Sequence, residues 1–284
     1  MKPSRIAFFA ADIEPSAVDI AQLRLWLSLV IDDEINPNAQ SALDGHKNPL
    51  PLPNLESNIL CGNSLIDEFE GTRLIKESDL FGDSTYQLDM NHSRFESIVK
   101  SLIEKQNELF RCDNTEKKKQ LKDEIESLRD MVILSQLEGC TPDKIHRYHE
   151  SKRMASKPYV LWQLDFARVF REKGGFDIVI GNPPYVDSEE MTRSMPEQRE
   201  LYTKKYSCAK GNWDLFVLFI EKGMDLLAEN KTISYIVPNK LISAPYTETL
   251  RKKMAKNRVI EIRDYSNVNV FKEAAVYPVV FRVE

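Results

Sequence analysis

Apolar runs alternate along the chain with segments of helical periodicity. Short, nearly continuous apolar runs bounded by turn residues predict buried strands, and they occupy residues 5–13, 58–61, 176–180, 232–237, 259–264 and 276–283. Helical patterns occupy residues 17–31, 213–228 and 246–256. Because continuously apolar strands are typical of sheets covered on both faces, we predict an α/β fold with a mostly parallel sheet and helices on both faces. We expect the final strand pair to be antiparallel.

The helix expected at residues 17–31 is apolar on most of its sides, as Ile20, Leu23, Leu25, Trp26 and Leu27 show. A helix that is apolar all round is normally buried between layers. We therefore predict that this helix is covered on more than one face.

Residues 71–158 differ in character from the segments on either side. Residues 95–136 are heavily charged and carry apolar positions spaced for two amphipathic helices, with a break at residues 113–115. We predict an antiparallel helical pair, an exposed insertion without chemistry of its own. The expected organisation is residues 1–70 as one half of a domain, 71–158 as a charged helical insertion and 159–284 as the catalytic half.

Composition excludes several protein classes. With 42% hydrophobic residues, the 284-residue chain can bury a true core. Its four cysteines include no C-x-x-C pair, which argues against a zinc ribbon or a redox dithiol. Cys140, His146 and His149 lack a fourth ligand, so we predict no metal site. No apolar stretch is long enough for a membrane span, and we expect a cytoplasmic protein.

The most informative segment follows the strand at residues 176–180, where the sequence reads Asn182-Pro183-Pro184-Tyr185. Two prolines stiffen the backbone and remove two donors. The Asn182 side-chain oxygen and the Pro183 carbonyl can accept both hydrogens of a planar NH2 group while the Tyr185 ring stacks on it. Holding both hydrogens aims the nitrogen lone pair at an electrophile, which is catalysis by positioning. A plain turn with a packed tyrosine is the alternative.

The run from Phe176 to Tyr185 resembles the catalytic motif of S-adenosylmethionine-dependent amino-methyltransferases, especially DNA adenine-N6 enzymes. The resemblance implies a class I, Rossmann-like methyltransferase fold. It extends to residues 11–15, where Asp12 would bind the cofactor ribose and Ile13 would pack on its adenine. It also covers residues 61–65, where Asn63 and Ser64 would bind the cofactor. Asp12 as a helix-capping acid and Asn63 as a turn residue remain alternatives.

Two further residues are implied as substrate-binding. Residues 236–240 and 269–281 are similar to later motifs of the same family, so Lys240 would contact the substrate and Phe271 would stack on the target base. A core position for Phe271 is the alternative. Residues 213–216 add to a resemblance with the methyltransferase part of type IIG restriction–modification enzymes. It covers about residues 6–70 and 159–284.

The match departs from the family at one place. The first glycine is Gly45, so the first strand, with the Gly-rich loop that holds the methionine part of the cofactor, is missing. We expect an N-terminally incomplete domain, an exposed edge beside Phe8 and Phe9, and weak or absent cofactor binding by the chain alone. A missing N-terminal segment and a target-recognition domain are the expected protein partners.

The function expected from this resemblance is methyl transfer from S-adenosylmethionine to N6 of a flipped-out adenine in double-stranded DNA. It would form part of a restriction–modification or phage-defence system. Two alternatives stay open at this point. One is a methyltransferase for protein glutamine or RNA guanine N2, and the other is an inactive remnant that only binds a partner.

Overall fold

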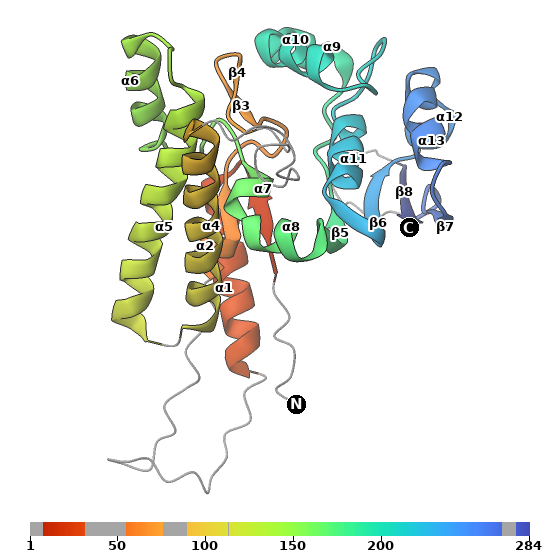
Figure 1. Cartoon of the computed structure of the whole chain (residues 1–284). Helices are drawn as coiled ribbons and strands as arrows, with labels where there is room; N and C mark the ends of the chain where they lie inside the picture. The colour runs from red at the N-terminus through yellow and green to blue at the C-terminus, as the bar shows by residue number, and fades with distance from the viewer. Residues whose placement is uncertain (1–7, 32–54, 76–89, 113, 269–276) are drawn as a thin grey trace, which may run out of the picture. The chain divides into compact units, whose positions relative to one another are not determined.

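The computed structural model describes residues 8–31, 55–75, 90–112, 114–268 and 277–284. The chain divides into two compact units, Met1–Arg168 and Val169–Glu284 (Figure 1). Each unit is described below by itself.

Unit 1 contains short strands and most of the long helices. Its elements are β1 (Ala10–Asp12), α1 (Pro15–Ile31), α2 (Leu55–Asn58), β2 (Ile59–Cys61), β3 (Glu68–Phe69), β4 (Thr72–Arg73), α4 (Met90–Arg111), α5 (Thr115–Gln136), α6 (Pro142–Ser151) and α7 (Trp162–Asp165). The helix α8 (Ala167–Lys173) includes the boundary between the units.

The strands β1 and β2 form a parallel pair in which Asp12 lies opposite Cys61. One face of α1 packs against this pair, since Val18 and Leu25 cluster with Ile59. The other side of α1 differs from the prediction of a helix buried between layers. Ile20 and Leu23 are about half exposed, because no described element covers them.

The two helices expected in the insertion are confirmed as α4 and α5. Asn114 begins α5 as its N-cap, and its side chain accepts a hydrogen bond from Lys117 N at 2.9 Å. The pair is not simply exposed, because it is held to the segment around α7. Arg129 forms a buried ion pair with Asp165 at 2.6 Å, and Gln106 Nε2 donates to the Leu164 carbonyl at 3.0 Å. The insertion is therefore part of the packing of unit 1.

Unit 2 contains a four-stranded sheet with the order β5-β6-β8-β7. Its elements are β5 (Phe176–Gly181), α9 (Ser188–Ser194), α10 (Pro196–Lys205), α11 (Phe216–Asp225), β6 (Leu227–Pro238), α12 (Lys240–Ser243), η1 (Pro245–Thr247), α13 (Glu248–Met254), β7 (Val259–Asp264) and β8 (Pro278–Val283). β5 and β6 are parallel, whereas β8 is antiparallel to both β6 and β7. The α/β class is confirmed. In the sheet of unit 2, only the β5–β6 pair is parallel, and the pairs that involve β8 are antiparallel.

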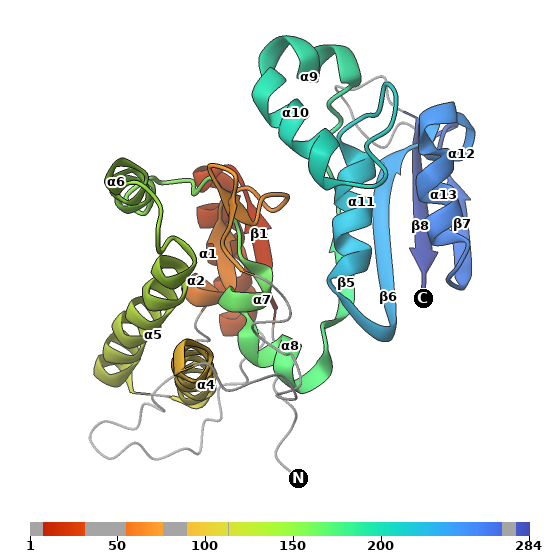
Figure 2. The same cartoon turned by 45° about the horizontal axis from the view of Figure 1, so that its top comes forward.

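The two faces of this sheet differ in cover. α11 and α13 lie over one face (Figure 2), where Ile233, Val237 and Phe281 are buried. On β5, side chains alternate between the faces, and Ile178 and Ile180 are 67% and 76% exposed. Within the described residues, the second face of β5 is therefore open.

One predicted boundary is wrong. Residues 213–228 were expected to form a single helix, but α11 ends at Asp225 and β6 begins at Leu227. Leu227 pairs with Phe176 of β5, and the Phe176 N–H donates to the Leu226 carbonyl at 2.9 Å. Pairing with β5 therefore makes the last residues of this segment a strand, although their apolar pattern would also suit a helix.

Candidate functional site

The Asn182–Tyr185 loop begins directly at the end of β5. The Asn182 side chain is exposed, and it forms no hydrogen bond with any described residue, while Pro183 is buried. The amide is thus available to a ligand, and the stiff backbone that carries it is anchored in the protein. The contact of this amide with an amino group stays a prediction.

A close approach of two strands fixes the start of this loop. A Cβ added to Gly181 would lie 3.0 Å from the ring of Tyr235 on β6, and one added to Gly223 on α11 would lie 2.5 Å from the Tyr235 hydroxyl. Both glycines therefore leave room for the buried Tyr235 ring. The sequence reasoning had not identified this contact, because the three residues are far apart along the chain.

Tyr185 is partly buried, and burial raises the pKa of its phenol. The loop continues into a second anchored segment. The Leu215 N–H donates to the Val186 carbonyl at 2.9 Å, and Asp187 caps α9 by accepting from Glu190 N at 2.9 Å. The loop is therefore tied to the start of α11 and to α9.

A buried carboxylate lies in the segment tied to the loop. Asp214 Oδ2 accepts from Lys240 Nζ at 2.9 Å and from the Tyr246 hydroxyl at 2.7 Å. Burial, together with the hydrogen bond to Asp214, raises the pKa of Tyr246. Lys240, which was expected to contact substrate, thus stands at the carboxyl end of β6 with a fixed partner. Asp214 lay within the residues that carried the resemblance, but nothing in the sequence assigned it a role.

A second buried carboxylate holds the loop between α10 and α11. Glu221 accepts hydrogen bonds from Ser207 N at 3.2 Å, Cys208 N at 2.9 Å and the Ser207 hydroxyl. Burial alone would raise the pKa of Glu221, but these donors and Lys253 at 3.5 Å outweigh it and lower the pKa. Burial and the Glu221 charge raise the pKa of Cys208 to about 11, so its thiol is protonated at neutral pH.

In unit 1, the residues expected at the cofactor lie at the carboxyl ends of β1 and β2. The Gly62 N–H donates to the Asp12 carbonyl at 2.8 Å, which joins the two strand ends. The Asp12 carboxylate is exposed and accepts from Glu14 N at 2.9 Å. Ile13 is also exposed. An accessible carboxylate beside an accessible apolar side chain fits a ribose and an adenine ring.

Asn63 and Ser64 follow β2 directly. Asn63 is buried, and its side-chain oxygen accepts from Leu65 N at 3.0 Å. This bond across two residues is typical of an Asx-turn, and it favours a turn role for that oxygen. Ser64 is half-buried, and its carbonyl accepts from Trp162 Nε1 at 3.3 Å.

The expected site residues form two groups, and each group lies within one unit of the chain. Asp12, Ile13, Asn63 and Ser64 belong to unit 1, and the 182–185 loop with Lys240 belongs to unit 2. Phe271 lies outside the described residues. Among the described residues, no cluster of His, Cys, Asp or Glu side chains could hold a metal ion.

A basic run at the end of α13 has intramolecular partners; it consists of Arg251, Lys252, Lys253, Lys256 and Arg258. Arg251 Nη1 donates to the Ala244 carbonyl at 2.9 Å, Lys252 pairs with Glu248 at 2.7 Å, and Lys253 pairs with Asp225 at 2.8 Å. These contacts support a solvated, self-paired helix end rather than a surface reserved for an anion.

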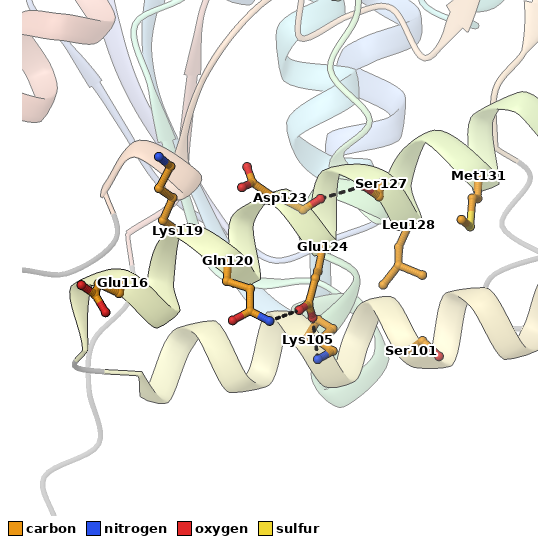
Figure 3. A pocket seen from close by; sticks show the side chains of 10 residues that line it. All are labelled: Ser101, Lys105, Glu116, Lys119, Gln120, Asp123, Glu124, Ser127, Leu128 and Met131. Carbon is orange, nitrogen blue, oxygen red and sulfur yellow. Dashed lines mark hydrogen bonds and ion pairs between the residues drawn. The ribbon is translucent and has the colours of Figure 1, made fainter.

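A groove of about 710 Å³ lies between α4 and α5 (Figure 3). Lys105 and Glu124 pair across it at 2.6 Å, and Gln120 Nε2 donates to Glu124 at 2.8 Å. These three polar side chains thus bind one another. None of the predicted site residues lines it, so volume alone does not locate the chemistry in this chain.

Comparison with known proteins finds similarity to restriction-modification methylases. The family model for the Eco57I restriction-modification methylase matches residues 7–271. The type II restriction enzyme and methyltransferase RM.Eco57I of Escherichia coli is 32% identical over 103 residues, which are 36% of this chain and 10% of that protein. A Methanocaldococcus jannaschii protein assigned as a type II restriction enzyme and methyltransferase is 25% identical over 312 residues, 94% of this chain and 25% of that protein.

A third relative is a methyltransferase by name. The type II methyltransferase M.BstVI of Geobacillus stearothermophilus is 30% identical over 128 residues, 44% of this chain and 22% of that protein. The chain therefore spans a quarter or less of each of these three relatives. A solved Listeria monocytogenes structure assigned as a class I S-adenosylmethionine-dependent methyltransferase matches 39% of this chain and 32% of its own, at 18% identity and a TM-score of 0.31. None of the helices in the described ranges has the length and apolar character of a membrane span.

Proposed function

The chain belongs to the Eco57I restriction-modification methylase family, and on this premise we propose that it carries the methyl-transfer site of a DNA adenine-N6 methyltransferase. The exposed Asn182 amide beside the anchored Pro183, at the carboxyl end of β5, carries this proposal. Ligands of open α/β sheets gather at this end of the strands.

The chemistry follows from the loop. The Asn182 side-chain oxygen and the Pro183 carbonyl accept the two hydrogens of the adenine N6 amino group, and the Tyr185 ring stacks on the base. This grip directs the nitrogen lone pair away from the ring, so that the nitrogen becomes the nucleophile. Pro184 keeps the loop rigid. No group of shifted pKa has to remove a proton first, because the nitrogen releases one hydrogen to solvent as a proton after it has accepted the methyl group.

S-adenosylmethionine supplies the methyl group as an electrophile when it is bound. Asp12 would hold its ribose hydroxyls, and Ile13 would pack on its adenine, which their exposure supports. Asn63 and Ser64 would line the same strand ends. Since the Asn63 oxygen already bonds Leu65 N, its part would be to shape the turn.

The substrate is double-stranded DNA with the target adenine flipped out of the stack, and the reaction takes place in the cytoplasm. A base inside the duplex cannot reach a loop at a strand's end, so flipping is required. Phe271 would complete the stack on the base, and Lys240 would contact the DNA.

Further polypeptide is the expected protein partner. β5 is an edge strand of its sheet, and Ile178 and Ile180 stand exposed on its open face. In unit 1, the exposed side of α1 is similarly apolar. Exposed edges and apolar faces of this kind are normally covered in a working protein. We assign their cover to a strand and helix with a Gly-rich turn, and sequence reading of DNA to a target-recognition domain.

The test is methyl transfer itself. Radiolabelled S-adenosylmethionine and duplex DNA are incubated with the chain, alone and co-expressed with a segment that supplies the strand and Gly-rich turn, and N6-methyladenine is measured by mass spectrometry. We expect Asn182→Ala to lower the rate by about 10²-fold or more, the cost of losing one positioned transition-state acceptor, with cofactor affinity unchanged.

The matched control is Asn257→Ala, which removes an exposed asparagine whose side-chain amide donates to the Lys253 carbonyl on α13. It should retain the full rate. Methylation that survives in Asn182→Ala, or methyl transfer to RNA or a glutamine peptide in place of DNA, would contradict the proposal.

A further inference from the structure

One carboxylate oxygen organises the surface beside the Asn182–Tyr185 loop. Asp214 Oδ2 accepts both the Lys240 ammonium at 2.9 Å and the Tyr246 hydroxyl at 2.7 Å. The side chain of Asp214 is only 8% exposed, whereas that of Lys240 is 52% exposed. The carboxylate is thus shielded, whereas about half of the lysine side chain that it holds is accessible to solvent.

This group stands at the same end of the sheet as the loop. β5 and β6 are parallel neighbours with Gly181 opposite Tyr235. Lys240 follows the end of β6 by two residues, and Asn182 follows the end of β5 by one. Strand spacing of about 5 Å and a rise of about 3.3 Å per residue place the two backbones on the order of 10 Å apart.

The turn that carries Lys240 is held from several sides. Thr247 Oγ1 donates to the Leu241 carbonyl at 3.0 Å, and Arg251 Nη1 donates to the Ala244 carbonyl at 2.9 Å. The peptide next to Asp214 is itself tied to the loop through Leu215 N and the Val186 carbonyl, at 2.9 Å. The backbone is therefore fixed, and Asp214 removes the remaining freedom of the lysine head.

An ammonium has three hydrogens to donate. Asp214 takes one of them, and the exposure of Lys240 leaves others available to a second anion. Phosphate oxygens are the usual partners of such a lysine in DNA complexes, where they position the duplex without reading its sequence.

We infer that Asp214 is a positioning residue that holds Lys240 so that its ammonium binds a backbone phosphate of the DNA strand whose adenine enters the Asn182–Tyr185 loop. This inference rests on the proposed function, since it takes DNA as the substrate. It adds a residue that touches neither the base nor the cofactor. Asp214 acts only through the groups that it orients.

The experiment measures binding of the chain, alone and with the co-expressed segment, to a labelled duplex with adenine opposite an abasic site, by fluorescence anisotropy over a range of salt concentrations. Each phosphate contact contributes about 0.9 to the slope of log K against log salt. We expect Lys240→Gln to lower the slope by about 0.9. Its affinity deficit should therefore shrink about eightfold for a tenfold rise in salt.

Asp214→Asn tests the positioning role, because the amide fills the same space without the charge. It should weaken binding and lower the slope in the same direction as Lys240→Gln. In the double variant, Asp214→Asn should change affinity by less than about twofold beyond Lys240→Gln alone, since both act on one contact. Tyr246→Phe keeps Lys240 paired with Asp214 and should leave the slope unchanged.

Lys252→Gln is the matched control, because Lys252 is an exposed lysine paired with Glu248 on α13; its slope should equal that of the wild type. A purely structural Asp214 would give weaker binding at an unchanged slope, or losses that add to those of Lys240→Gln, and either result would overturn the inference. An unchanged slope in Lys240→Gln, or no DNA binding by the wild type at low salt, would also overturn the inference. Lys240-dependent binding without methyl transfer would instead refute the proposed function alone.

Discussion

Replacement of Glu221 by Gln tests how the loop before α11 is held in place. Glu221 is 4% exposed, and its carboxylate receives two backbone N–H groups and one hydroxyl from Ser207 and Cys208. Gln has nearly the same shape, so packing is preserved. What changes is that one oxygen becomes an NH2 group that faces a donor.

The size of the effect follows from these contacts. A hydrogen bond to a charged group contributes about 1.5–3 kcal/mol, and a buried donor left without a partner costs about 1–3 kcal/mol. Glu221→Gln weakens the bonds that remain and orphans at least one donor. We expect the free energy of unfolding of unit 2 to fall by about 2–4 kcal/mol.

Urea unfolding followed by tryptophan fluorescence measures this change. Trp213 is buried in unit 2, and Trp26→Phe with Trp162→Phe leaves it as the single tryptophan, because the chain has three. Glu248→Gln removes a carboxylate that is exposed and paired with Lys252, and it should leave the free energy of unfolding essentially unchanged. If Glu221→Gln behaves like this control, the contacts of Glu221 do not stabilise the loop.

The pH dependence has a definite sign. The pKa of Glu221 lies below its ordinary value of 4.5 in the folded chain. Its contribution is therefore fully present above pH 4.5 and is lost as the pH falls through the lowered pKa. The stability difference between wild type and Glu221→Gln should shrink below pH 4.5. A difference that stays constant into that range would refute the electrostatic explanation.

Three further substitutions test other parts of the fold. Gly181→Ala places a Cβ 3.0 Å from the Tyr235 ring and should cost about 1–3 kcal/mol in urea unfolding, as overpacking does. Arg129→Ala leaves the buried Asp165 carboxylate without its counter-ion and should cost unit 1 about 3–5 kcal/mol, measured by Trp162 fluorescence. Asn114→Ala removes the N-cap of α5 and should lower stability by about 1 kcal/mol in thermal circular dichroism. Wild-type stability in any of them would contradict the contact concerned.

The sequence is most informative about the candidate site where the candidate residues are neighbours in the chain. Asn182 and Pro183 are neighbours, so strand end, rigidity and acceptor groups could all be inferred from one short segment, and the structure places them at the end of β5. The Asp214 cluster could not be inferred in this way. Its partners, Lys240 and Tyr246, lie 26 and 32 residues farther along the chain, and only the folded sheet brings them to one carboxylate.

The misplaced boundary between α11 and β6 has a similar cause. An apolar run such as residues 213–228 satisfies both a buried helix and a buried strand. The pairing of Phe176 on β5 with Leu227 decides between them. A Cβ added to Gly175, the residue before β5, would lie 2.5 Å from Ala228 N, which shows how closely the backbones approach there. A partner some fifty residues earlier in the chain therefore decides where the helix ends, and no local pattern contains that information.

The apolar pattern of α1 is a different case. It predicted that most sides of the helix are buried, but it did not identify the segment that covers them. Val18 and Leu25 pack on β2, whereas Ile20, Leu23 and Leu27 remain about half exposed. Full burial of a leucine or isoleucine side chain contributes about 1.5–3 kcal/mol, so each of these three obtains only part of it within the described residues. Covering them would add a few kcal/mol of stability. A partner for this face therefore requires no specific polar contacts to bind, only a complementary apolar surface.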